Sequence, residues 1–251
     1  KNRKEKILVV NLETNLLNSQ KDAPVNSISF SLYKGEVLGI FGLMGAGRTE
    51  LMETLFGLRG NRNGLTIDGE VRVIHSPSDA IKAGLALVPE DRKRDGLLIE
   101  ADVRFNLCIT TLDDLETMGL LSFQKESALT EKYIGELQIK TPSQTQLTKN
   151  LSGGNQQKIV LAKWLATKPK VLMLDEPTRG IDVNAKNEIY KLIQKLADEG
   201  MAIIMVSSVL PEILAESVRI LVMTEGEITA EFNAEDATES KILEKAIPKT
   251  V

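Results

Sequence analysis

The chain has very little of the chemistry on which many catalytic and metal-binding sites depend. It contains one cysteine, Cys108, and one histidine, His75. A single cysteine excludes an internal disulfide, and a single histidine excludes a metal site built from several histidines. A Ser–His–Asp triad is not expected either, because His75 follows a strand-like run and is interpreted as a turn residue. Cys108 is interpreted as a small, half-buried apolar residue.

Long apolar runs are also missing. No run approaches the roughly 20 residues that a membrane-spanning helix needs, and the few apolar residues after the basic start KNRKEK are too few for a signal-peptide core. We therefore expect a cytoplasmic chain, soluble as an isolated domain, that meets a membrane only through partners. Because it begins with Lys1 rather than Met, we also expect a fragment of a longer polypeptide.

A strong excess of positive charge is absent as well. The 251 residues carry 31 basic and 35 acidic side chains, a net charge of -4. A protein that wraps nucleic acid normally presents a broad basic face, so no nucleic-acid partner is expected. The hydrophobic share of 42% and the charged share of 26% are ordinary for a soluble globular protein.

Apolar runs of strand length recur along the chain and alternate with helical patterns in its second half. We expect strands at 7–12, 27–33, 36–43, 70–74, 85–90, 171–175, 202–208, 218–223 and 228–232. Helical patterns occupy about 48–57, 153–167, 184–198, 210–216 and 234–247. This alternation predicts an α/β protein with a parallel sheet covered on both faces.

The segment 101–148 has a different pattern. It contains no strand-like run, and the stretches 105–121 and 126–139 are both interpreted as helices. We therefore predict an α/β core formed by 1–100 and 149–251, including an N-terminal β-subdomain, and a helical subdomain at 101–148 inserted into that core.

The stretch GLMGAGRTEL, residues 42–51, follows an apolar strand and opens a helix. This is the context of a phosphate-binding loop, where glycines let backbone N–H groups face the anion and the helix start adds positive potential. The pattern G-x-x-x-x-G-K-[ST] requires a lysine where this chain has Arg48. Taken alone, the stretch fits a structural glycine turn as well as it fits a nucleotide site.

A pair of carboxylates ends the strand-like run VLMLDEPT, residues 171–178. A carboxylate at the position of Asp175 holds Mg²⁺ in ATPases with a phosphate loop, and the next one, Glu176, can orient the attacking water. The simpler interpretation, a charged turn after a strand, is weakened by the phosphate loop upstream.

The octet LSGGNQQK, residues 151–158, opens another helix. Ser152 and the free amides of Gly153 and Gly154 form a second helix start suited to an anion. An ordinary capped helix is the alternative, and the order of the three motifs disfavours it.

Together, GAGRTEL, LSGGNQQK, LDEP and the later GID (180–182) resemble the nucleotide-binding domain of ATP-binding cassette (ABC) transporters over essentially the whole chain. The resemblance implies a P-loop NTPase (RecA-like) core with a parallel sheet, an antiparallel β-subdomain and an inserted helical subdomain. The longer matches LALVPEDRKRDGLL, LDEPTRGIDVNAKNEIYKLI and VSSVLPEIL are similar to the C-terminal cassette of bacterial monosaccharide importers. Those are the ribose, xylose and galactose type, whose ATPase carries two cassettes in one polypeptide.

The resemblance implies a head-to-tail pair of cassettes, with each ATP between one cassette's phosphate loop and the other's LSGG helix. The partner would be the N-terminal cassette of the same polypeptide or a second copy. The pair would drive a transmembrane permease at the cytoplasmic face of the bacterial inner membrane, and would serve a sugar-binding protein indirectly. ATP and Mg²⁺ are the implied cofactors.

In the half-site that uses the chain's own phosphate loop, the resemblance assigns residues to three roles. ATP binding falls to Gly42, Leu43, Met44, Gly45, Ala46, Gly47, Arg48, Thr49 and Glu50. Thr49, Glu90 and Asp175 would bind Mg²⁺, and Glu176 and Ser208 would be the catalytic residues.

This half-site departs from the family pattern. Arg48 replaces a lysine, and a planar guanidinium is no equivalent of a compact ammonium. Glu50 replaces a second hydroxyl, Glu90 a glutamine and Ser208 a histidine, and losing such a donor typically costs about 3 kcal/mol. No aromatic residue precedes Phe30, so the usual adenine-stacking ring is missing. We expect weak or partner-dependent ATP binding here, and little hydrolysis.

The other half-site keeps the family pattern, so we expect the chain to act mainly in trans. Four residues are expected to close over ATP held by the partner cassette: Ser152, Gly153, Gly154 and Gln156. Asp182 is expected to run along the dimer seam. In the charge run EDRKRDG (90–96) only Glu90 is expected to be functional, and the rest is interpreted as a solvated loop.

Two alternatives stay open. One is a regulatory module that binds nucleotide without turnover. The other is a DNA-repair or chromosome-organising ATPase, which shares the LSGG helix. The second is disfavoured because no sustained heptads separate Gly47 from Ser152 and the net charge is acidic.

Overall fold

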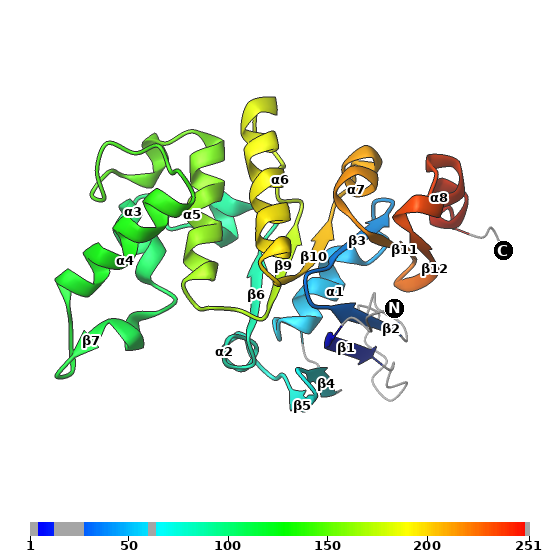
Figure 1. Cartoon of the computed structure of the whole chain (residues 1–251), viewed down its shortest axis with the longest axis horizontal. Coiled ribbons are helices and arrows are strands. Elements are labelled where there is room, and N and C mark those ends of the chain that lie inside the picture. Colours follow the sequence, from blue (N-terminus) through cyan, green and yellow to red (C-terminus); the bar gives the residue numbers. More distant parts are fainter. Residues whose placement is uncertain (1–4, 13–27, 60–63, 249–251) are drawn as a thin grey trace. The chain divides into compact units, whose positions relative to one another are not determined.

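The computed structural model describes residues 5–12, 28–59 and 64–248 (Figure 1). Two compact units make up the described chain. The first, which we call the sheet unit, comprises the described parts of Lys1–Leu87, with Lys170–Glu176 and Ile193–Val251. The second, the helical unit, comprises Val88–Pro169 and Pro177–Leu192. The predicted division into a core and an insertion at 101–148 stays a prediction.

A six-stranded sheet forms the core of the sheet unit, in the order β12-β11-β3-β10-β9-β6. Its strands are β3 (Val37–Gly42), β6 (Leu85–Val88), β9 (Val171–Asp175), β10 (Ala202–Val206), β11 (Arg219–Thr224) and β12 (Glu227–Asn233). Strands β11, β3, β10 and β9 pair in parallel, and β12 pairs antiparallel at one edge. Strands β3, β9 and β10 are buried along their whole length, which is typical of parallel strands covered on both faces. The predicted parallel α/β core is confirmed.

Helices pack on this sheet. Helix α1 (Arg48–Leu55) contacts β3 and β9, α7 (Leu210–Glu216) contacts β3, and α8 (Glu239–Ala246) contacts β3, β11 and β12. Helix α6 spans Val183–Asp198. Within the described residues, no helix is long and apolar enough to span a membrane.

A second, four-stranded sheet has the order β2-β1-β4-β5 and is antiparallel throughout. Its strands are β1 (Lys6–Leu12), β2 (Ile28–Tyr33), β4 (Gly64–Ile67) and β5 (Glu70–Val73). It is the predicted antiparallel β-subdomain. The sequence pattern missed β4 and the short helix α2 (Pro77–Lys82), although Asp68-Gly69 is a strong hairpin signal. Both turn residues have positive φ, 53° and 79°.

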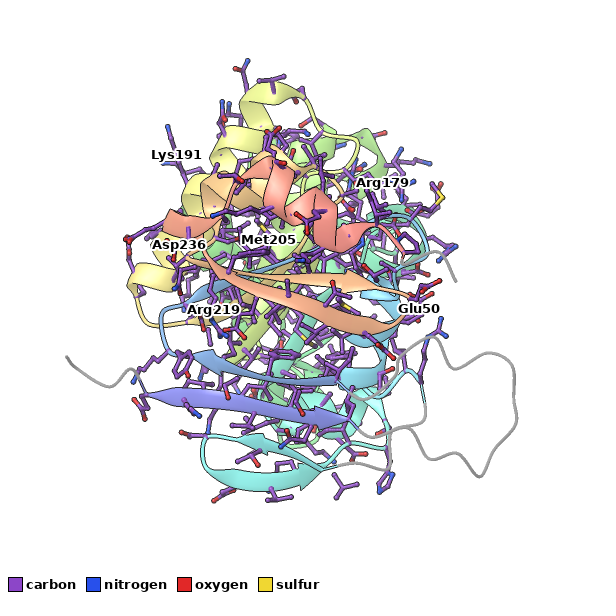
Figure 2. All side chains as sticks on the ribbon, turned by 90° about the vertical axis from the view of Figure 1, so that its right-hand side faces the viewer. Glu50, Arg179, Lys191, Met205, Arg219 and Asp236 are labelled. Carbon is purple, nitrogen blue, oxygen red and sulfur yellow. The ribbon has the colours of Figure 1, made fainter. Side chains whose placement is uncertain are left out.

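A buried arginine ties several of these strands together (Figure 2). Arg219, at the start of β11, donates from Nε to Oε1 of Glu36 at 2.8 Å and from Nη2 to Oε2 at 3.1 Å. It also donates from Nη1 to Glu231 of β12 at 2.6 Å and to the backbone oxygen of Ser31 in β2. Desolvation opposes its charge, but hydrogen bonds to Glu36 and Glu231 hold the pKa of Arg219 above its ordinary value. Since Glu36 precedes β3, this network fixes the strand that leads to the phosphate loop.

The helical unit is built from the helices α3, α4 and α5, the first part of α6, short turns of other helix types and a small hairpin. Its elements are the π-helix η1 (Arg92–Gly96), α3 (Val103–Cys108), η2 (Leu112–Leu115), β7 (Glu116–Thr117), β8 (Leu120–Leu121), α4 (Phe123–Glu136), η3 (Thr148–Asn150) and α5 (Gly153–Leu165). Helix α3 packs against both α4 and α5 (Figure 1).

The prediction of one helix over 105–121 is wrong. Helix α3 ends at Cys108, and Thr111 bonds back to the Cys108 carbonyl oxygen through both its N–H and its hydroxyl. After η2, the chain forms the hairpin β7–β8 around Met118 and Gly119, which have φ of 52° and 77°. These left-handed conformations suit a tight two-residue hairpin turn and cannot continue a helix.

Lys163, a buried residue of α5, has a lowered pKa that can be tested by experiment. The Lys163 side chain is 8% exposed, and its Nζ donates to the Gly96 carbonyl oxygen at 2.5 Å. Burial lowers the pKa of Lys163 from 10.5 to about 8. The charge is therefore costly in the folded chain below pH 8, whereas the unfolded chain keeps its proton up to about pH 10.5.

Stability should consequently rise between these two pH values, since the unfolded state then binds more protons than the folded state. Relative to Lys163→Met, the free energy of unfolding of the natural chain should increase by about 2 kcal/mol from pH 7 to pH 9.5. Urea denaturation of both proteins at the two pH values measures this difference. A difference that stays flat would mean that Lys163 is not desolvated in solution.

Candidate functional site

The stretch 42–51 forms a loop between a buried strand and a helix start in the sheet unit. Gly42 ends β3, and a Cβ there would lie 2.6 Å from the Met223 carbonyl oxygen and 2.7 Å from Cβ of Ala46. Gly45 and Gly47 have φ of 82° and 92°, a region that side chains rarely enter. The loop therefore requires glycine at these three positions, for packing at one and for backbone conformation at two.

The start of α1 suits an anion. Within the described residues no side chain caps this helix, because its N-cap is Gly47. The N–H groups of the first turn thus keep their capacity to bind a phosphate oxygen. Leu43 and Met44 at the loop tip are 41% and 99% exposed. The glycine conformations and the uncapped start of α1 are those expected of a phosphate-binding loop, so the loop residues fit ATP. The individual contacts predicted between residues 42–50 and ATP stay a prediction.

Arg48, in this loop, forms an ion pair with Glu176. Nη1 of Arg48 lies 3.4 Å from Oε1 of Glu176, and the two side chains are only 14% and 12% exposed. Glu176 directly follows β9 and has φ of 47°, an unusual conformation for a side chain this large. Its N–H donates to the Val206 carbonyl oxygen at 3.0 Å, which fixes the turn against β10. The arginine that replaces the expected lysine thus contacts the expected catalytic carboxylate.

Ser208 also reaches Glu176, but through its backbone. The Ser208 N–H donates to Oε1 of Glu176 at 2.6 Å. The same carboxylate oxygen therefore accepts from both Arg48 and Ser208. Any residue except proline at position 208 could supply this amide, so a serine in place of the family's histidine can still make the contact. A catalytic role for the Ser208 hydroxyl stays a prediction.

Two of the three predicted magnesium ligands belong to the sheet unit. Asp175 ends β9 and is 2% exposed, and Thr49 lies in the first turn of α1, which contacts β9. Glu50 follows Thr49 in the same turn. No group of three or more His, Cys, Asp or Glu side chains in the described ranges is placed to hold a metal ion. The assignment of Mg²⁺ to Thr49 and Asp175 stays a prediction.

The start of α5, in the helical unit, is organised by its own residues. Ser152 is the N-cap, and its Oγ accepts from the Asn155 N–H at 3.4 Å and from Nδ2 of Asn155 at 2.9 Å. The Asn155 side chain in turn accepts from the Lys140 N–H at 2.8 Å. The signature serine thus stabilises the helix start that carries Gly153 and Gly154.

Both signature glycines are closely packed, and packing requires glycine at position 154. A Cβ on Gly154 would lie 2.5 Å from Cβ of Ala185 in α6. A Cβ on Gly153 would lie 2.7 Å from Nη2 of Arg92 and 3.1 Å from the Gly180 carbonyl oxygen. Real Cβ atoms essentially never lie within 3.0 Å of another atom, so a side chain at 154 would force α5 and α6 apart, whereas one at 153 would displace the Arg92 guanidinium. The LSGG segment is therefore packed directly against the chain around 180–185.

Gln156 lies in a buried hydrogen-bond network. It is 3% exposed, and its Nε2 donates to the Thr148 carbonyl oxygen at 3.1 Å. Thr148 is itself buried, and its hydroxyl accepts from Nδ2 of Asn106 at 3.1 Å. These bonds link the start of α5 to η3 and α3, and the predicted contact of Gln156 with a partner's ATP stays a prediction. A direct contact with ATP would require it to leave this network.

Asp182, expected at the dimer seam, is exposed and begins α6. Its Oδ1 accepts from the Ala185 N–H at 3.0 Å, which is the role of a helix N-cap. Its expected place at an interface stays a prediction.

The charge run 90–96 is only partly a solvated loop. Glu90, the third predicted magnesium ligand, forms an ion pair with Arg179. Arg92, interpreted from the sequence as solvated, donates to the carbonyl oxygens of Arg179 and Gly180. The sequence could not distinguish Arg92 from the charged residues that follow it, because Lys93, Arg94 and Asp95 are all exposed.

The comparisons agree with this arrangement. A family model described as ABC transporter matches residues 25–179. The chain belongs to the ABC transporter family, and it is an ATP-binding domain of that family. It is 53% identical over 231 residues to the ribose import ATP-binding protein RbsA of Rhodopirellula baltica, covering 91% of this chain and 45% of that protein. It is 52% identical over 221 residues to the xylose import ATP-binding protein XylG of Thermoanaerobacter pseudethanolicus, covering 87% and 44%. The chain thus spans about half the length of the curated relatives it matches.

Solved structures confirm the fold. A nucleotide-free ATP-binding cassette from an ABC transporter matches with a TM-score of 0.79 at 20% identity, covering 97% of this chain and 100% of that chain. CbiO1 from Clostridium perfringens, part of the ABC transporter complex cbiONQ, matches with a TM-score of 0.76 at 24% identity, covering 96% and 92%.

Proposed function

We propose that this chain is the second ATP-binding cassette of a bacterial monosaccharide importer and acts mainly by completing the ATP site of a partner cassette. The names of its ribose-import and xylose-import relatives, at 53% and 52% identity, support the sugar class. The partner would be the N-terminal cassette of the same polypeptide or a second copy. The pair would drive a transmembrane permease at the cytoplasmic face of the inner membrane, supplied by a sugar-binding protein.

The contact between Arg48 and Glu176 carries the proposal that the chain's own half-site hydrolyses little ATP. A carboxylate that orients water needs its oxygens available to that water. Here Oε1 of Glu176 accepts from a largely buried arginine and from the Ser208 amide. ATP entering this loop would compete with Glu176 for Arg48, which makes binding weaker than in a loop with lysine. Thr49 and Asp175 would hold Mg²⁺, which would shield the charge of the phosphates when bound.

The glycines at the start of α5 support the second part, action in trans. Gly154 is packed too closely against Ala185 for a side chain, Gly153 lies against Arg92 and the Gly180 carbonyl oxygen, and Ser152 orders the helix start. The first N–H groups of α5 are thus fixed in direction, and they face an anion at no cost of reorganisation. The sequence LSGGNQQK keeps the pattern that the family uses to close over a partner's ATP.

An ATPase assay on the chain alone and after mixing with the proposed N-terminal cassette tests both parts. The chain alone should show little turnover, and the mixture should be active. Glu176→Gln in this chain should change the activity of the mixture less than about twofold, because the active phosphate loop belongs to the partner.

Two results would contradict the proposal. An active isolated chain that loses its activity with Glu176→Gln would make the chain's own site catalytic. ATP binding without turnover, both alone and in the mixture, would instead favour a regulatory module.

A further inference from the structure

Arg92 makes two hydrogen bonds to a segment far away in the sequence. Its Nη1 donates to the Arg179 carbonyl oxygen at 2.7 Å, and its Nη2 donates to the Gly180 carbonyl oxygen at 3.1 Å. All of these residues belong to the helical unit. The guanidinium therefore holds the backbone that leads into Asp182.

The same guanidinium packs against the LSGG segment. A Cβ on Gly153 would lie 2.7 Å from Nη2 of Arg92, so the glycine and the guanidinium are in direct contact. A Cβ on Gly180 would lie 3.8 Å from both terminal nitrogens. Arg92 thus lies between two glycines, one in each segment.

The base of the Arg92 side chain is also fixed. It begins η1, which is capped by Asp91: Oδ1 of Asp91 accepts from the N–H groups of Lys93 and Arg94 at 3.0 and 3.1 Å. Those bonds, the Arg94 amide first, lower the pKa of the Asp91 carboxyl. Desolvation lowers the pKa of Arg92 itself, which agrees with its partial burial. The capped turn η1 therefore fixes the backbone from which the Arg92 side chain reaches the 179–180 carbonyl oxygens.

We propose that Arg92 is a positioning residue that keeps the LSGG helix start and the 179–182 segment in register, so that both can close over one ATP in a partner cassette. This inference rests on the proposed function in trans. The two segments are separated by more than 20 residues of chain, and no backbone hydrogen bond between them is needed because one side chain contacts both. Their relative position then depends on Arg92 together with the direct packing of Gly154 against Ala185.

Arginine is suited to this role for a physical reason. Its planar fork offers two parallel N–H donors at a fixed separation, which matches two successive carbonyl oxygens. A lysine offers its donors from one atom on a more flexible stem, so it can replace the charge and one bond but not the fixed geometry. The ion pair between Glu90 and Arg179 holds the other side of the segment, but both partners are exposed and contribute little.

Three variants of this chain test the inference, each mixed with the proposed N-terminal cassette. Arg92→Ala should lower the kcat of the mixture about tenfold, as loss of a charge-assisted hydrogen bond does. Arg92→Lys should recover part of that loss. Arg94→Ala is the matched control, because Arg94 lies two residues away, is exposed and pairs only locally with Asp95. It should match the natural chain.

Amide hydrogen exchange on the isolated chain provides the readout that a general loss of structure would not give. Arg92→Ala should accelerate exchange in 152–156 and 179–183 without changing the thermal midpoint, and Arg94→Ala should not. Unchanged exchange in these segments, or a mixture as active as the natural one, would overturn the role of Arg92. An inactive mixture with the natural chain would instead overturn the proposed function.

Discussion

Replacing Arg219 with methionine is expected to lower the free energy of unfolding by about 3–5 kcal/mol. The reason is the carboxylate that the arginine would leave behind. Glu36 is 3% exposed, and both of its oxygens accept from Arg219. Without the guanidinium, the Tyr33 N–H at 2.9 Å would be the one hydrogen-bond donor left to Glu36 among the described residues. A buried charge with one neutral donor is strongly destabilising. Urea denaturation followed by circular dichroism measures the loss.

A second variant separates the buried charge from the lost packing. Arg219→Met combined with Glu36→Gln should recover most of the stability, because glutamine keeps an acceptor for the Tyr33 amide and carries no charge. The surface pair of Arg72 and Glu70 provides the control, since their side chains are 53% and 67% exposed. Arg72→Met should change stability by less than about 0.5 kcal/mol. Equal losses for Arg219→Met alone and for the double variant would show that packing of the arginine stem, not the charge, stabilises the sheet unit.

The parallel core could be predicted because its signals are local. The strand VLGIFG is apolar at nearly every position, as buried parallel strands are. Glycines at 42, 45 and 47 mark the loop that follows, and the helix begins at once. Each of these features lies within a few residues of the next, so the sequence pattern alone specifies strand, loop and helix.

Contacts between distant residues could not be predicted in this way. Arg48 lies 128 residues from Glu176, and Arg92 lies 87 residues from Arg179. Arg92 stands among charged residues in the sequence, where a solvated side chain is the ordinary interpretation, and Arg48 is expected at a nucleotide and not at Glu176. Only the fold brings them to the carboxylate and to the carbonyl oxygens that they contact.

For Gln156, the family resemblance predicts a contact with ATP, whereas the structure shows a buried side chain. Gln156 stands in the signature octet and was expected at ATP, but its position on α5 places it in the buried network with Thr148 and Asn106. Burial of the helix explains this: residues 156 to 166 are all buried, so α5 has no exposed face at this point. A motif identifies which residues occur together, whereas burial decides which of them a ligand can reach.

Replacing Gly154 with alanine is expected to lower the ATPase activity of the mixture by about 10²–10³-fold. The added Cβ would lie 2.5 Å from Cβ of Ala185, so the start of α5 must move away from α6 or tilt. Either movement redirects the N–H groups that we propose to stabilise the phosphates of the partner's ATP. Losses of this size follow when one such donor is misplaced in an active site. Steady-state kinetics with natural and variant chains, each mixed with the proposed N-terminal cassette, measure the effect.

Gly135 offers a matched control within the same unit. It lies in α4, and a Cβ there would meet no atom within 4 Å. Gly135→Ala should therefore leave activity unchanged and raise stability by about 0.5–1 kcal/mol, because alanine favours the helix more than glycine does. Thermal unfolding of both variants shows whether Gly154→Ala remains folded. A folded Gly154→Ala chain that supports full activity would exclude a role for the LSGG helix start in the partner's site, because the crowding at Ala185 leaves that helix start no way to accept the methyl group unmoved.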